Sequence, residues 1–169
     1  MTWRLYRHFK GNLYLGLGRF LDSENKHAFE AYICLYENDL AQEWIRPFEM
    51  FHGKNSDGIQ RFSPIGRVRV AYPEDEAQIL IQLWSNSQQD TSLANFLDQY
   101  KHSTQSLQGT RFLLETQNGE LIGSVIAIRV RRGVIRLEEL DIQKSFRNEG
   151  WDTLLARAVT VINRDESRQ

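Results

Sequence analysis

The uneven distribution of aromatic residues is the feature that most constrains how this chain can fold. Of its 19 Phe, Trp and Tyr residues, 12 lie before residue 63 in a chain of 169 residues. Each buried ring removes a large apolar area from water, so a short segment this rich in rings can form a compact core of its own. We therefore expect a small domain over residues 1–55, a linker over 56–66 that collects turn-forming residues, and a second domain over 67–169.

The first block is predicted to consist of four or five short strands. Gly11 and Asn12 predict a turn after the first strand, and Gly16 and Gly18 predict a bulge in the second. Alternating hydrophobic residues in AFEAYICLYEN predict a third strand, and Pro47 restricts WIRPFEMF to an edge strand or a turn. Several short strands in about sixty residues indicate a small β-barrel-like domain.

The second block is predicted to run strand, helix, helix, strand, strand, strand, helix. Pro73 is expected to open the first helix, Asn118-Gly119 to form a tight hairpin turn, and Gly133 to separate the last two strands. The whole chain is therefore predicted to be α+β. Helical spacing predicts a buried stripe on the first helix, formed by Ala77, Leu80, Ile81 and Trp84, and another on the last, formed by Trp151, Leu154, Leu155, Ala158, Val159 and Ile162.

Charge and cysteine content exclude several classes of protein. Lys and Arg number 21 against 22 Asp and Glu, which argues against non-specific nucleic-acid binding. The single cysteine, Cys34, cannot form an intrachain disulfide and is expected to be a buried thiol, and four scattered histidines predict no metal site. No apolar run is long enough to cross a membrane, and MTWRLYRHFKG has no hydrophobic signal core, so we expect a cytoplasmic protein.

The segment Phe146–Asp152 is the strongest candidate for a ligand site. It connects a predicted strand to the last predicted helix, where consecutive backbone N–H groups can bind an anion. Gly150 would let a phosphate approach the backbone closely. Taken alone, the segment reads equally as a simple loop that closes a strand–helix unit.

In context, the second block resembles the GNAT superfamily of acetyl-CoA-dependent N-acetyltransferases. RVRVAYPEDEAQILIQLW is similar to that family's opening strand and helix, RFLLETQNGELIGSVIAIRV to its hairpin, and LEELDIQKSFRNEGWDTLLARAV to its strand–loop–helix core. The likeness extends from Arg67 to about Asn163 and implies a partial GNAT-like antiparallel sheet with helices. Within the Arg/Gln-x-x-Gly-x-Gly/Ala loop of the family, Arg147 and Gly150 match.

The resemblance also implies an activity and the residues that carry it. The activity would be acetyl transfer from acetyl-CoA to an amine, borne by a small molecule or by a protein N-terminus or lysine. A glutamate on the last strand, Glu138 or Glu139, would act as general base, although a solvent-facing role for both is the simpler interpretation. The coenzyme would contact the main chain near Ile142 and the loop residues Arg147, Asn148, Glu149, Gly150, Trp151 and Asp152.

Two departures from the family pattern open an alternative. Asp152 places a carboxylate where the pyrophosphate should lie. The chain also stops after the coenzyme helix, so the remaining strands of the family fold are absent and the strand over 134–143 is left as an open edge. We therefore expect either a homodimer through that edge or cover from within the chain. The alternative function is a non-catalytic interaction or ligand-binding protein that uses the N-terminal domain.

The first block resembles a small bacterial domain of unknown function. The pattern Tyr-Arg-His-x-Lys-Gly followed by Trp-x-Arg-Pro-x-x-Met-Phe covers roughly residues 4–52. Its basic residues, Arg7, His8, Lys10 and Arg46, form a candidate polar cluster for an anion or a partner. The alternative is that Arg7 and Arg46 pair with Glu37 or Glu49 at the surface.

Overall fold

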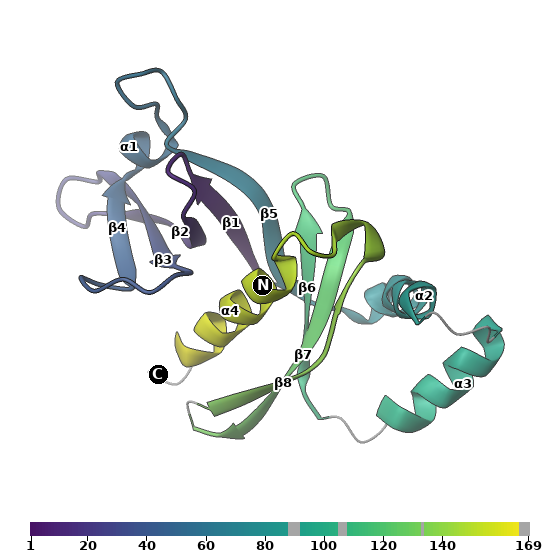
Figure 1. Ribbon diagram of the computed structural model, residues 1–169. Coiled ribbons are helices and arrows are strands. Elements are labelled where there is room, and N and C mark those ends of the chain that lie inside the picture. The colour runs from purple at the N-terminus through teal and green to yellow at the C-terminus, as the bar shows by residue number, and fades with distance from the viewer. Residues whose placement is uncertain (88–91, 105–107, 133, 166–169) are drawn as a thin grey trace. The chain divides into compact units, whose positions relative to one another are not determined.

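The computed structural model describes residues 1–87, 92–104, 108–132 and 134–165. The chain divides into two compact units: Met1–Arg69 with Glu115–Glu120, and Val70–Leu114 with Leu121–Gln169. The elements of the first unit are β1 (Thr2–His8), β2 (Leu13–Leu21), β3 (Ala28–Cys34), β4 (Glu43–Pro47), α1 (Phe48–His52) and β5 (Phe62–Val70) (Figure 1). Those that follow are η1 (Pro73–Asp75), α2 (Glu76–Asn86), α3 (Leu93–Thr104), β6 (Thr110–Thr116), β7 (Leu121–Arg131), β8 (Val134–Ile142), η2 (Lys144–Phe146) and α4 (Trp151–Asp165).

The first unit is an open antiparallel sheet with the strand order β4-β3-β2-β1-β5. The predicted turn at Gly11 and the bulge between Gly16 and Gly18 are both present. The helices and antiparallel strands of the chain confirm the α+β class. No pairing joins β4 to β5 among the described residues, so the predicted barrel-like closure is wrong. Pro47, which has no N–H group to donate, ends β4 as an edge strand, and the chain continues into α1.

Part of the segment predicted as a linker belongs to β5. Residues 62–66 pair with β1, with Phe62 opposite His8 and Pro64 opposite Tyr6. Pro64 and Gly66 flank a bulge in this pairing, a position at which proline is tolerated in a sheet. The residues that predicted irregular structure therefore mark an interruption within one strand.

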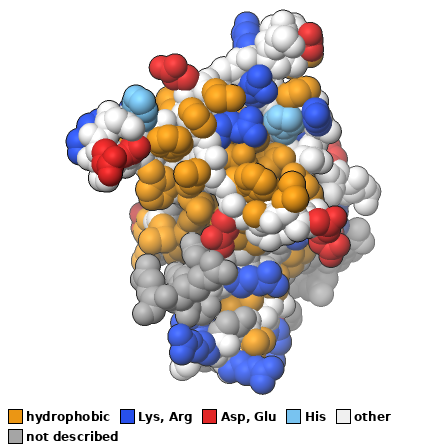
Figure 2. Space-filling model, turned by 90° about the vertical axis from the view of Figure 1, so that its left-hand side faces the viewer, with side chains coloured by type: hydrophobic (Ala, Val, Ile, Leu, Met, Phe, Trp, Pro, Cys, Tyr) orange, Lys and Arg blue, Asp and Glu red, His pale blue; other side chains and the backbone are white. Residues whose placement is uncertain are grey.

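An aromatic cluster forms the core on one side of this sheet. The buried members are Tyr6, Tyr14, Tyr32, Cys34, Phe51 and Phe62. The rings of Phe51 and Phe62 stack with centroids 4.0 Å apart, and Tyr6 meets Phe51 edge-on at 5.0 Å. Cys34 is a buried free thiol, as predicted. Figure 2 shows one face of the molecule, on which basic and histidine side chains lie among hydrophobic ones.

The second unit contains the strands β6, β7 and β8 in that order. The predicted hairpin turn is present, with Gly119 at a φ of 86°, whereas Gly133 lies outside the described residues. Helix α4 packs on β7 and β8, and its predicted stripe is buried apart from the half-buried Trp151. No helix in the described part of the chain is both long enough and apolar enough to cross a membrane.

The predicted stripe of α2 is wrong. Ile81 is 56% exposed and Trp84 36% exposed, while Ile79, Gln82 and Asn86 are buried. The face with Ile79, Gln82 and Asn86 is turned inward because Gln82 and Asn86 form hydrogen bonds with β8, described below. Spacing alone could not reveal this, since it ranks polar side chains as surface residues.

Strand β8 is the last strand in the order. Leu140 is 39% exposed, as expected for an uncovered edge, but Ile142 is 6% exposed. Self-association along this edge stays a prediction.

The stacked pair in the aromatic cluster leads to a stability prediction. Phe51→Ala removes a fully buried ring and should lower the free energy of unfolding by about 3–5 kcal/mol. The matched control is Phe20→Ala, whose ring is 54% exposed, with an expected change within about 0.5 kcal/mol. Urea denaturation followed by tryptophan fluorescence measures both, and equal losses would show that the cluster is not the core of this unit.

Candidate functional site

A cavity of about 330 Å³ lies where β8 ends and α4 begins. Its walls are formed by Leu140, Asp141, Ile142, Phe146, Arg147, Asn148 and Asp152. Of the predicted coenzyme residues, the structure therefore brings Ile142, Arg147, Asn148 and Asp152 together around one space. Glu149, Gly150 and Trp151 complete the loop and the start of the helix, where Trp151 Nε1 donates to Glu149 Oε2 at 2.9 Å.

The loop before α4 contains two residues with a positive φ. Asn148 and Gly150 have φ values of 67° and 80°, in the left-handed region where glycine is favoured. The helical hydrogen bonds begin with Leu154 N–H donating to Gly150 O at 3.0 Å. The preceding N–H groups of the first turn have no partner within the helix, which is the arrangement that binds anions.

A polar network that the sequence analysis missed lies beside this cavity. Gln82 Nε2 and Asn86 Nδ2 donate to Asp141 Oδ2 at 3.1 and 2.7 Å. The Arg147 guanidinium lies 3.7 Å from Asp141 Oδ1 and donates from Nε to the Ile142 carbonyl at 3.1 Å. The Asp141 charge is thus compensated within the protein. The available signal was the four-residue spacing of Gln82 and Asn86, which places both on one helix face.

Two features of the cavity bear on an anionic ligand. The Ile142 carbonyl accepts from Asn86 as well as from Arg147, so it is already engaged by side chains. Asp152 also lines the cavity, and no ion pair compensates its carboxylate among the described residues. The negative charge of this carboxylate partly cancels the positive charge that the N-terminus of α4 offers to an anion.

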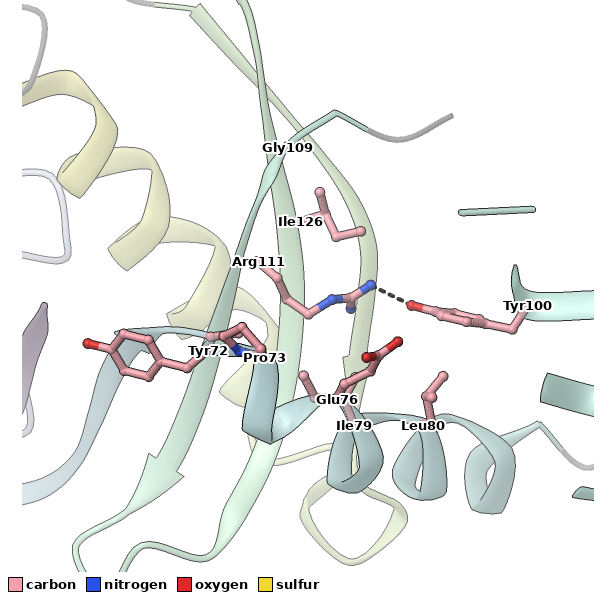
Figure 3. A pocket seen from close by; sticks show the side chains of 10 residues that line it. Tyr72, Pro73, Glu76, Ile79, Leu80, Tyr100, Gly109, Arg111 and Ile126 are labelled. Atoms are coloured by element: carbon pink, nitrogen blue, oxygen red, sulfur yellow. Dashed lines mark hydrogen bonds between the residues drawn. The ribbon is translucent and has the colours of Figure 1, made fainter. Parts of the chain in front are cut away.

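A second cavity, of about 310 Å³, lies among residues of η1, α2, α3, β6 and β7 (Figure 3). Figure 3 shows the side chains of Glu76, Tyr100 and Arg111 pointing toward one another. Arg111 Nη2 donates to Tyr100 Oη at 2.6 Å, and Arg111 Nη1 donates to Ser124 Oγ at 3.2 Å. Sequence reasoning did not single out any of these residues, because they come from separate elements without a recognisable spacing.

The two predicted catalytic glutamates have different surroundings. Glu139 occupies a bulge in β8, with a φ of 48°, and its carboxylate accepts from Arg111 at 2.7 Å and from Tyr100 at 3.1 Å. Glu138 pairs with Arg136 at 2.7 Å. Only Glu139 therefore contacts residues that line the second cavity, and both carboxylates are held by arginine.

Burial raises the pKa of Tyr100 to about 12, and the neighbouring Glu139 carboxylate adds to this effect while Arg111 opposes it. The phenol is consequently a neutral donor at pH 7. In the described part of the chain, no three His, Cys, Asp or Glu side chains gather in a way that could hold a metal ion.

Comparisons with known proteins give matches to separate parts of the chain. A family model described as a protein of unknown function, DUF1653, matches residues 4–64. A DUF1653 protein from Bordetella bronchiseptica is similar in structure at 29% identity, with a TM-score of 0.32, over 35% of this chain and 80% of its own. A GNAT-family acetyltransferase from Staphylococcus aureus Mu50 is similar at 14% identity, with a TM-score of 0.40, over 59% of this chain and 66% of its own. A search of curated proteins gives no match.

The family match confirms that the N-terminal block resembles a small domain of unknown function, and it extends the likeness from residue 52 to residue 64. That extension includes the first residues of β5, which pair with β1. The similarity to the acetyltransferase is distant and assigns no role to any residue of this chain.

The Tyr100 contacts predict a pH-dependent stability difference. At pH 7, Tyr100→Phe should lower the free energy of unfolding by about 1–2 kcal/mol because the bonds to Arg111 and Glu139 are lost. The raised pKa stabilises the folded state below the unfolded value of about 10, and this contribution disappears as pH rises toward the folded value. The gap between wild type and variant should therefore narrow above pH 10 in thermal melts, and a gap that widens there would contradict the assignment.

Proposed function

We propose that the second unit binds acetyl-CoA at the loop before α4 and transfers its acetyl group to an amine. The observation that carries this proposal is the cavity of about 330 Å³ at the start of the 15-residue helix α4. The loop that leads into this helix contains two residues with a left-handed backbone. Backbone N–H groups and the helix dipole there favour a pyrophosphate. The resemblance in element order from Arg67 onward supplies the chemical identity of the ligand.

The general base of the proposed reaction is Glu139. The amine nitrogen attacks the acetyl carbonyl carbon, the thioester C–S bond breaks, and the sulfur leaves as the coenzyme thiolate. Glu139 takes the proton that the amine releases, directly or through water. The neutral Tyr100 phenol and the Arg111 guanidinium hold the Glu139 carboxylate at this position.

A non-catalytic ligand-binding protein is the second candidate, and two observations favour it. Arginine side chains hold both glutamates, and Asp152 lines the proposed pyrophosphate site. In that case the protein would bind acetyl-CoA, or a ligand in the first unit, without turnover. Calorimetry and an acetyl-transfer assay on the same preparation distinguish the two candidates.

Removal of the Asp152 carboxylate should strengthen acetyl-CoA binding. One charge at a partly exposed site is worth about 1 kcal/mol, so the Kd of Asp152→Ala should fall about fivefold. Asp39→Ala is the matched control, because Asp39 is an exposed aspartate of the first unit, and it should leave the Kd unchanged. Isothermal titration calorimetry measures all three proteins, and an unchanged Kd for Asp152→Ala would show that the pyrophosphate does not lie on this loop.

The base assignment is tested by two substitutions on one strand. Glu139→Gln should lower kcat about 100-fold or more without a matching change in acetyl-CoA affinity. Glu138→Gln, one residue away and paired only with Arg136 in the described structure, should retain kcat. Equal effects of the two substitutions would remove Glu139 as the base, while binding without turnover in the wild type would favour the second candidate.

A further inference from the structure

Basic side chains gather at one end of the aromatic cluster in the first unit. Phe62 lies at the centre of the group: its ring is 4.7 Å from the His8 ring and 5.6 Å from the Arg46 guanidinium carbon. Lys10 follows in the β1–β2 turn, with Nζ 5.9 Å from the Phe9 ring. Arg61, in the chain before β5, belongs to the group because its charge acts on the His8 ring; its backbone carbonyl accepts from Phe9 N–H at 3.0 Å. We name His8, Lys10, Arg46 and Arg61 the basic cluster.

The composition of the basic cluster differs from that expected from the sequence. Arg7 is exposed and, as the neighbour of His8 in β1, points to the opposite face of the sheet. Arg61 takes its place. The alternative of surface ion pairs is also not observed, since no ion pair links Arg46 to Glu37 or Glu49 in the part of the chain that the structure describes.

The cations of the basic cluster, Lys10, Arg46 and Arg61, lack carboxylate partners within ion-pair distance in the described part of the first unit. The acidic residue opposite Arg46 across β3 and β4 is Glu30, and its buried carboxylate lies 3.3 Å from His52 Nε2. The charges of Lys10, Arg46 and Arg61 all act on the His8 ring, and an anion bound among them would reduce their mutual repulsion.

His8 adds a hydrogen-bond donor to the basic cluster. Burial lowers its pKa, and the charges of Arg46, Lys10 and Arg61 lower it further, so the ring is neutral at pH 7. Its Nδ1 lies 3.3 Å from the Lys10 backbone N–H and accepts from it, which leaves the proton on Nε2. Another titratable group beside the ring is Tyr14, whose ring centroid is 6.3 Å away on β2.

We propose that the basic cluster binds a phosphate dianion, either free or as the monoester group of a small molecule. Two guanidinium groups can each bind phosphate oxygens with paired N–H donors, and Lys10 adds a point charge. A dianion compensates more of the charge of the three cations than a single carboxylate would. The exposed Phe9 ring beside Lys10 offers an apolar surface to the remainder of such a molecule. This site lies in the first unit and does not depend on acetyl-CoA binding.

The test is an NMR titration of His8 in the full chain. Inorganic phosphate and adenosine monophosphate are added separately at constant ionic strength, with chloride as the reference anion. Bound phosphate should shift the His8 ring signals with a Kd of about 1 mM or lower and raise the pKa of His8, because an anion stabilises the charged imidazole. A lower Kd for adenosine monophosphate would assign the site to a monoester, and equal values would assign it to free phosphate.

Matched variants separate this site from general charge effects. Lys10→Gln and Arg61→Gln should each weaken phosphate binding about three- to tenfold, whereas Arg7→Gln, which removes the same charge from the other face of β1, should not. The proposal fails if ~10 mM phosphate leaves His8 unshifted, or if Arg7→Gln weakens binding as much as Lys10→Gln. It also fails if only a single-stranded oligonucleotide shifts His8, since the ligand would then be a nucleic acid.

Discussion

The contacts of the Phe62 ring organise the first unit. The ring stacks on Phe51 of α1, meets Tyr14 and Tyr32 from two strands, and faces His8 across the β1–β5 pairing. A fully buried ring of this size contributes several kcal/mol, about the scale of a whole domain's net stability. Because Phe62 is also the first residue of β5, its burial fixes where that strand begins. The same ring supports the basic cluster, so the packing of the core and the position of the charges have one origin.

The concentration of aromatic residues before residue 63 correctly predicted a core in the first block. The turn-forming residues that follow, however, led to a wrong end for that block. Asn, Ser, Asp and Pro between residues 52 and 66 have weak strand propensity. The pairing of Phe62 with His8 joins distant parts of the chain, so a local sequence pattern cannot predict it. Pro64 was consistent with either a linker or a bulge, and only the register of β1 decides between them. Closure of the sheet into a barrel likewise depends on pairing between distant edges, which strand count does not determine.

In the second unit, the loop before α4 could be singled out as a candidate from the sequence because its chemistry is local. Gly150 and its neighbours need only their own backbone and the start of α4 to form the candidate site. The Arg111, Tyr100 and Glu139 group was not predictable, since its members lie on β6, α3 and β8 and meet only through the fold. The inward face of α2 was mispredicted for a related reason: Gln82 and Asn86 are buried through bonds to Asp141, a partner 55 or more residues away.

The bulge in β8 has a consequence for how this strand tolerates changes in length. Between the pairs Ser124–Asp141 and Ile126–Glu138, β8 contains one more residue than β7, and Glu139 accommodates it with a positive φ. The extra residue inverts the alternation of the strand, so positions on either side of it follow opposite parity. A one-residue deletion here would restore regular pairing, with Asp141 still opposite Ser124 and Glu138 still opposite Ile126, so side chains on either side would keep their faces. The change would instead fall on Glu139, the residue that the bulge accommodates and whose carboxylate accepts from Arg111 and Tyr100.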